Sequence, residues 1–107
     1  MLLDKRASIW RKVDVANVFA DTEVYGSIPC AIVPISKLDQ VVPYAYESTH
    51  VIWVPYWLEL RKEDQIRYGR RLADAFGNVV PWTYVINGRR QFDLGIRQLA
   101  FYSKEME

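Results

Sequence analysis

The fold is decided by one stretch of the chain, Thr49-His50-Val51-Ile52-Trp53-Val54-Pro55-Tyr56. Its centre is a run of β-branched and aromatic residues, which are the types that strands favour. Trp53 and Pro55 would share one side of such a strand, while Ile52 and Val54 would share the other, because successive side chains point to opposite faces. Both faces are apolar, so we expect both to be covered by a core or by a neighbouring element.

Further strands are predicted on both sides of this stretch by alternating or nearly continuous apolar runs. Pro29 and Pro34 lack an amide donor, so the run between them is expected at a sheet edge or with a break. Gly26, before that run, is a natural turn. The runs lie at residues 8–15, 28–35, 64–68 and 82–86, followed by a returning strand from 90 to about 103.

The second half of the chain holds two further local signals. Asn87-Gly88 is the strongest hairpin-turn signal in the chain. In the returning strand the phase of the apolar residues shifts, so we expect a β-bulge near Arg97 or Gln98. Segment 70–81 is open to two interpretations, one short helical turn that Gly77 ends or an irregular loop.

Together these patterns predict one mostly β domain that spans residues 1–107. Its expected architecture is a small barrel or sandwich of about six antiparallel strands, with one long inter-strand loop and at most one short helix. That loop is segment 36–48, which carries apolar residues without an evident core partner. Long loops of this kind are usually functional, and the alternative is a loop folded over the mouth of the barrel.

The charge balance argues against tight nucleic-acid binding. The chain has 14 basic and 13 acidic residues, a net charge near +1. A protein that follows a nucleic-acid backbone usually carries a clear basic excess on one face. The arginines of the second half therefore favour a solvated charged rim over a nucleic-acid groove; they are Arg67, Arg70, Arg71, Arg89, Arg90 and Arg97.

Residues suited to catalysis or metal binding are few. Cys30 is the only cysteine and has apolar neighbours, which indicates a buried thiol and excludes an intramolecular disulfide. His50 is the only histidine, and zinc would need three or four ligands at recognisable spacing. Glu59, Glu63 and Asp64 are expected to be turn and rim charges. The sequence predicts a non-enzymatic protein with no catalytic residue, no cofactor and no metal site.

The start of the chain contains no apolar signal-peptide stretch, since Met1-Leu2-Leu3 leads directly into Asp4-Lys5-Arg6. No window approaches the length of a membrane-spanning helix. We therefore expect the protein in a reducing, cytoplasm-like compartment.

Several motifs follow one another in an order that resembles a known family. An opening strand comes after Leu2-Leu3-Asp4-Lys5-Arg6-Ala7-Ser8-Ile9, and the middle strand is introduced by Thr49-His50. It is followed by Asp64-Gln65-Ile66-Arg67-Tyr68-Gly69, an "Asp-x-Ile-x-Tyr-Gly" segment. In this order the chain resembles, over nearly its whole length, the head-tail adaptor or head-closure (stopper) family of tailed bacteriophages.

The resemblance implies a small β-barrel in a ring beneath the portal complex, where it retains packaged DNA and docks the tail. The implied partners are copies of the same chain, a portal or adaptor protein above, a tail terminator or tail tube protein below, and the double-stranded DNA that passes through the channel; no membrane is implied. The implied location is the virion neck, after synthesis in the bacterial host cytoplasm. In the family the long connection can face the channel, so the candidate channel loop here is Lys37, Leu38, Asp39, Gln40, Val41, Val42, Pro43 and Tyr44.

Subunits of a ring need two different contact patches, since head-to-tail contacts close a ring. Aromatic residues suit such patches, and the candidates are Trp10, Tyr46, Trp53 and Trp57. Another neck or tail-completion ring protein is one alternative function. The other is a small nucleic-acid-binding barrel, with stacking surfaces from Trp53, Trp57, Trp82 and Tyr84 and phosphate contacts from the arginines at 67, 70 and 71.

Overall fold

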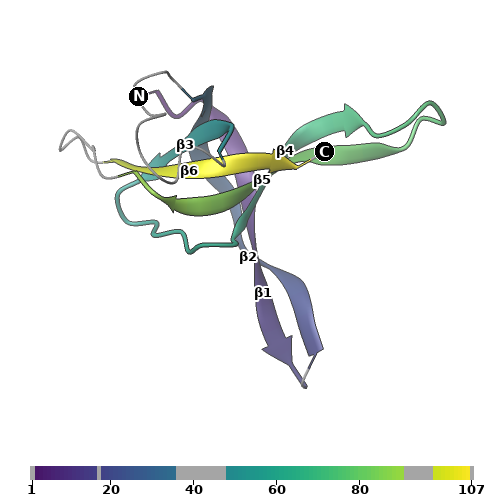
Figure 1. Cartoon of the computed structure of the whole chain (residues 1–107), viewed down its shortest axis with the longest axis horizontal. Helices are drawn as coiled ribbons and strands as arrows, with labels where there is room; N and C mark the ends of the chain where they lie inside the picture. The colour runs from purple at the N-terminus through teal and green to yellow at the C-terminus, as the bar shows by residue number, and fades with distance from the viewer. Residues whose placement is uncertain (1, 17, 36–47, 91–97, 107) are drawn as a thin grey trace.

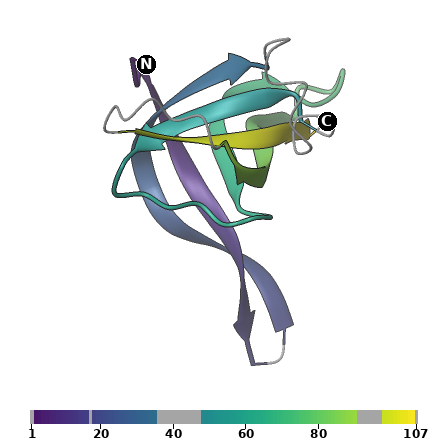
Figure 2. The same cartoon turned by 60° about the vertical axis from the view of Figure 1, so that its left-hand side comes forward.

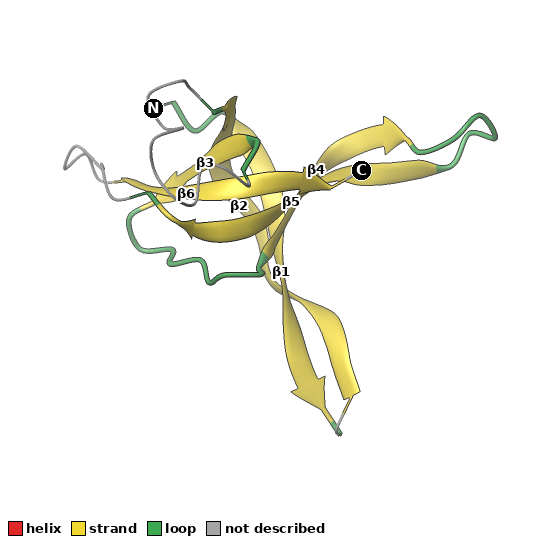
Figure 3. Ribbon diagram, in the orientation of Figure 1, coloured by secondary structure: helices red, strands yellow, loops and turns green. Residues whose placement is uncertain are grey.

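The computed structural model describes residues 2–16, 18–35, 48–90 and 98–106. Six antiparallel strands close into a barrel in the order β1-β2-β3-β6-β5-β4 (Figure 1). No helix occurs in these residues, as Figure 3 shows, so the predicted mostly β fold is confirmed as a barrel. The strands are β1 (Lys5–Val15), β2 (Val18–Pro34), β3 (His50–Pro55), β4 (Gln65–Leu72), β5 (Val79–Arg89) and β6 (Gln98–Met106).

β3 is buried on both faces, as its sequence predicts. Ile52 and Val54 point into the barrel and are fully buried. On the opposite face, Trp53 lies directly between Ala31 of β2 and Ala100 of β6 in the strand register. Two alanines leave space for the large indole across the neighbouring strands, and Trp53 is only 7% exposed.

The interior of the barrel is filled by apolar side chains from all six strands and from the connection between β3 and β4. That connection contributes Leu58 and Leu60, so it is part of the core and not only a surface loop. Removing this apolar surface from water is the main source of stability. The cluster consists of Ala7, Ile9, Ile28, Cys30, Ile52, Val54, Leu58, Leu60, Ile66, Tyr84, Ile86 and Phe101.

β2 is much longer than the sequence predicts, with 17 residues. It starts at Val18 and forms one hairpin with β1, so the turn expected at Gly26 is wrong. Gly26 and Ser27 instead lie inside β2, at a shift of register between the pairs Ala7↔Ile28 and Ile9↔Tyr25. Ser27 has a φ of 51°, as expected of a β-bulge.

Segment 70–81 forms neither of the two predicted structures, because it completes a second hairpin. β4 continues to Leu72 and β5 starts at Val79. Gly69, with a φ of 62°, lies at a shift of register next to Tyr68 and so does not end the strand. In the turn, Asp74 accepts hydrogen bonds from the backbone N–H groups of Phe76 and Asn78, at 2.8 and 3.4 Å.

Asn87-Gly88 is not a hairpin turn, although its sequence is the strongest turn signal in the chain. Both residues lie inside β5, where a register shift falls between Ile86 and Gly88. Here the Asn-Gly pair forms a β-bulge opposite β6 instead of a turn. Of the positions predicted for a bulge in the returning strand, Gln98 is the first residue of β6 and Arg97 lies outside the described residues.

The core can be tested by a matched pair of substitutions in one strand. Ile66 of β4 is fully buried, while Leu72 of the same strand is 70% exposed. We expect Ile66→Ala to lower the free energy of unfolding by about 2–5 kcal/mol, because it removes buried methylene groups and leaves a cavity. Leu72→Ala should change it by less than about 0.5 kcal/mol. Urea denaturation measures both values, and equal effects would contradict this description of the core.

Cys30 gives a second test, based on pH. Its side chain is 1% exposed, and burial raises the pKa of the thiol from 9.0 to about 11. Because the folded-state pKa is the higher one, the thiol's contribution to stability is complete below pH 9 and is lost as the pH rises towards 11. The free energy of unfolding should therefore fall more steeply over this range in the wild type than in Cys30→Ala. Identical pH profiles would contradict the buried thiol.

Candidate functional site

Two hairpins continue beyond the barrel and project in different directions (Figures 1 and 2). Arm 1 is defined here as residues 11–26 of the β1–β2 hairpin, and arm 2 as residues 69–81 of the β4–β5 hairpin. β1 pairs with β4 only from Ser8 to Trp10, and β5 pairs with β6 only from Thr83 to Arg89. Each arm is therefore a two-stranded ribbon, without a third strand among the described residues.

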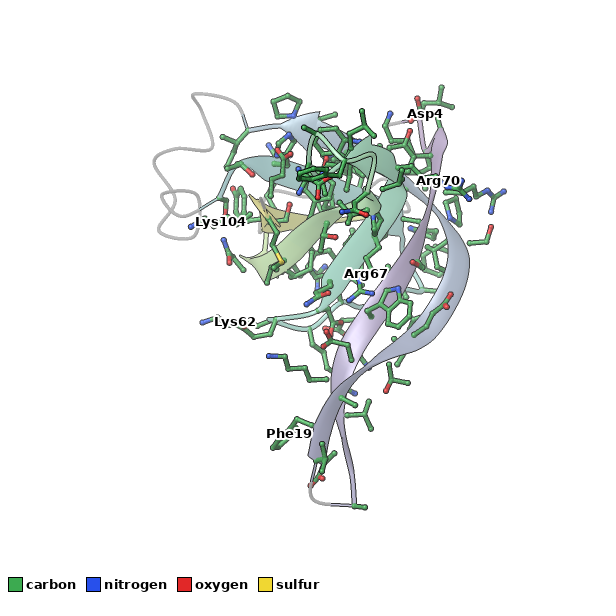
Figure 4. All side chains as sticks on the ribbon, turned by 90° about the vertical axis from the view of Figure 1, so that its right-hand side faces the viewer. Asp4, Phe19, Lys62, Arg67, Arg70 and Lys104 are labelled. Atoms are coloured by element: carbon green, nitrogen blue, oxygen red, sulfur yellow. The ribbon has the colours of Figure 1, made fainter. Side chains whose placement is uncertain are left out.

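Both arms carry large apolar side chains in water. In arm 1, Val18 is 64% and Phe19 74% exposed, and Figure 4 shows Phe19 close to the far end of this hairpin. In arm 2, Leu72, Phe76 and Val79 are 70%, 91% and 53% exposed. Single exposed apolar residues are common, but groups of them at the ends of projecting elements are typical of protein contact sites.

A buried ion pair holds the base of arm 1. Asp64 is 1% exposed and accepts hydrogen bonds from Nε and Nη2 of Arg11, at 2.9 and 2.8 Å. The backbone N–H of Arg61 donates a third bond to the same carboxylate at 2.9 Å. The hydrogen bond to Asp64 raises the pKa of Arg11 and so favours its charged form. Arg11 is the first residue of arm 1, so the pair fixes the point at which the arm leaves the barrel.

Asp64 does stand in a turn, as predicted, since its backbone N–H donates to the carbonyl of Arg61 at 3.0 Å, but its prediction as a rim charge is wrong because it is buried. Its partner Arg11 lies 53 positions away in the sequence, so no local pattern reveals the pair. Glu59 and Glu63 are exposed, in agreement with the prediction for those two residues.

A second contact supports arm 1 on the outer face of the barrel. The guanidinium of Arg67 lies 4.2 Å from the centre of the Trp10 ring, and Figure 4 shows Arg67 beside β1. Arg67 also donates to the side-chain oxygen of Gln65 at 2.8 Å and forms an ion pair with Asp21 of arm 1 at 3.5 Å. Trp10, a predicted interface residue, is thus partly buried at the junction of β1 and β4.

Arm 2 is held at its base by a similar pairing of arginine and tryptophan. Arg71 lies 5.2 Å from the ring centre of Trp82. Its Nη2 donates a hydrogen bond to the carbonyl of Met106 at 3.2 Å, which connects arm 2 to the end of β6.

The other candidate interface residues are not brought together. Trp53 is buried, with the guanidinium of Arg90 at 5.5 Å from its ring, so its prediction as an exposed interface residue is wrong. Trp57 is 56% exposed on the connection between β3 and β4. Tyr46 and the candidate channel loop, Lys37 to Tyr44, lie outside the described residues. Sequence reasoning missed the arm ends, although Val18-Phe19 and Phe76 stand in the sequence beside Asn17 and Gly77, which are residue types that favour turns.

Two of the four residues predicted for the stacking surface of a nucleic-acid-binding barrel are buried, while Trp57 is exposed and Trp82 half-buried. Trp53 and Tyr84 are each 7% exposed, so their ring faces are not accessible to bases. His50 makes an edge contact with Tyr84, with ring centres 5.1 Å apart, and its Nδ1 lies 2.9 Å from the Thr49 hydroxyl. These contacts give His50 a structural environment at the start of β3.

Groups of three or more potential metal ligands are not found in the described part of the chain. Nor is any helix there long and apolar enough to cross a membrane. The chain matches no protein-family model, and no curated protein sequence matches it.

The ion pair at the base of arm 1 can be tested by a double-mutant cycle. Arg11→Met should lower the free energy of unfolding by about 3–5 kcal/mol, because it leaves the Asp64 carboxylate buried without its partner. Adding Asp64→Leu should recover part of this loss, since the unpaired charge is then removed.

The control for this cycle is the surface pair of Lys5 and Asp4, 3.7 Å apart. Lys5→Met should cost less than about 1 kcal/mol, because both partners remain in contact with water. Urea denaturation of the wild type, of the single variants Arg11→Met and Asp64→Leu, and of the double variant gives the coupling energy. A double variant as unstable as the sum of the single changes would mean that Arg11 and Asp64 act independently.

Proposed function

We propose that this chain is a structural protein that joins other protein subunits, and that it acts as a head-closure or head-tail connector subunit in the neck of a bacteriophage virion. The observation that supports the proposal is the pair of projecting arms with exposed apolar ends. All the buried residues of the core cluster lie outside the arms, and among the described arm residues only Val24 of arm 1 packs against them, so the ends of the arms are available for contacts with other molecules.

The interior of the barrel favours a structural role over a ligand-binding one. Bulky side chains fill it, among them Phe101, Tyr84 and Ile52, which are less than a tenth exposed. A barrel that encloses a ligand needs an interior wider than its own side chains occupy. The surfaces that remain for function are therefore the outside of the barrel, the arms and the loops.

The resemblance to the head-closure family supports the more specific part of the proposal. In that role, copies of the chain form a ring below the portal, with a portal or adaptor protein above and a tail terminator or tail tube protein below. Double-stranded DNA passes through the ring. The net charge near +1 suits a channel in which DNA slides. A protein with few excess basic residues releases few counterions from the DNA phosphates, and so it binds DNA weakly.

A stop codon in the phage gene for this chain tests the role. Electron microscopy of the resulting particles should reveal tailless capsids that are empty or leaking after packaging. Wild-type protein supplied in trans should restore tailed particles, whereas Phe19→Ser together with Phe76→Ser should not, since both arm ends lose their apolar contact. Lys62→Glu, on the exposed connection before β4, serves as the control and should restore assembly. Normal tailed particles from the stop-codon phage would exclude the connector role.

A further inference from the structure

Both arms present an open strand edge. β3 pairs with β2 only from Ala31 to Pro34, so β2 from Val18 to Cys30 has β1 as its one neighbour among the described strands. β1 pairs with β4 only as far as Arg67, so β4 from Tyr68 to Leu72 has β5 as its one described neighbour. Open edges of this kind carry backbone N–H and C=O groups that are ready to pair with another strand.

Within each arm, one edge is better suited to such pairing than the other. In arm 2 the edge of β5 contains Pro81, which has no N–H to donate, whereas the edge of β4 contains no proline. In arm 1 the edge of β2 is the longer one, and its pairing with β1 stays in one register from Val18 to Glu23, before the two register shifts near Tyr25 and Ser27.

The two preferred edges carry opposite charges. Beyond the Arg11–Asp64 pair, arm 1 has three acidic residues against Lys12. Two of them lie on β2 itself: Asp21, which forms an ion pair with Arg67 at 3.5 Å, and the exposed Glu23. Arm 2 has Arg70 and Arg71 on β4 against Asp74 alone. The Asp74 carboxylate is engaged inside its own turn, where it also accepts a hydrogen bond from Nδ2 of Asn78 at 2.6 Å.

These edges do not meet within one molecule. The arms project in different directions, and Figure 4 shows Arg70 and Phe19 at well-separated places on the structure. An acidic edge and a basic edge on separate arms of the same chain are complementary surfaces for two copies.

We propose that the β2 edge of arm 1 in one copy pairs with the β4 edge of arm 2 in a second copy. The backbone groups of the two edges supply the hydrogen bonds, and the opposite charges of Glu23 and Arg70 select the partner edge. Phe19 and Leu72 are then covered by the contact. This inference rests on the proposed joining function and specifies the surfaces that two copies would use. The contact joins different patches, so it builds a ring or an open chain of copies.

Charge exchange between the two arms tests the contact in the full-length chain. Glu23→Lys and Arg70→Glu change exposed residues outside the core. In sedimentation velocity, wild-type protein should self-associate, and each variant alone should associate about tenfold or more weakly, because an attraction becomes a repulsion. An equimolar mixture of the two variants should regain wild-type association, since each reversed arm then meets an arm of opposite charge.

Lys62→Glu again serves as the matched control and should associate like the wild type. Far-UV circular dichroism and the urea midpoint establish that each variant is folded. A wild-type chain that stays monomeric at millimolar concentration would overturn the proposal. So would variants that associate like the wild type, or a mixture that associates no better than its components.

This outcome is separable from that of the proposed function. Loss of tails from the stop-codon phage together with association insensitive to Glu23 and Arg70 would refute only the arm contact. Association that follows the charge exchange, together with normal virions, would refute only the neck role.

Discussion

The structure depends on one constraint, which is that β3 must be covered on both faces. Ile52 and Val54 require an apolar interior on one side, and Trp53 requires shelter on the other. The closed barrel satisfies the first need, and the alanines at 31 and 100 on the neighbouring strands leave space for the indole. β3 lies between β2 and β6 and pairs with both. The position at which the indole of Trp53 fits therefore sets the register of both neighbouring strands. A shift of one residue would place Trp53 in the filled interior.

The arms follow from the lengths of the strands that surround this core. The barrel is complete when β1 has paired with β4 over Ser8 to Trp10, yet β1 has 11 residues and β2 has 17. The excess length leaves the barrel as a two-stranded ribbon, which alone is only marginally stable in water. Arg11–Asp64 and the stack of Arg67 on Trp10 hold its base. The chain thus uses charged and aromatic contacts at the junction, while the apolar ends remain exposed.

The sequence predicts the class of fold because the apolar runs are local and strong, as at Val51–Val54 and from Trp82 to Ile86. It fails where one local signal serves two structures. Glycine indicates a turn at 26 and 88, and the predicted run 64–68 stops before Gly69, yet all three glycines lie at shifts of register, and only the partner strand distinguishes these cases. The spacing of Leu72 and Phe76 suits a helix face as well as a hairpin end. Burial of Asp64 depends on Arg11, which is distant in the sequence.

Open edges are a hazard unless something restricts what can pair with them. On β2, the exposed Glu23 repels a second β2 edge, and on β4, Arg70 and Arg71 repel a second β4 edge. Like-charge repulsion therefore disfavours the symmetric pairings of arm 1 with arm 1 and of arm 2 with arm 2, and leaves the mixed pairing. One mixed contact leaves one arm of each copy unsatisfied, so a chain of copies keeps an open arm at either end. Growth then ends only when the contacts close on themselves. In the proposed contact, the charges on two short strands select the mixed pairing over random association of the apolar arm ends, and the product is a ring or an open chain of copies.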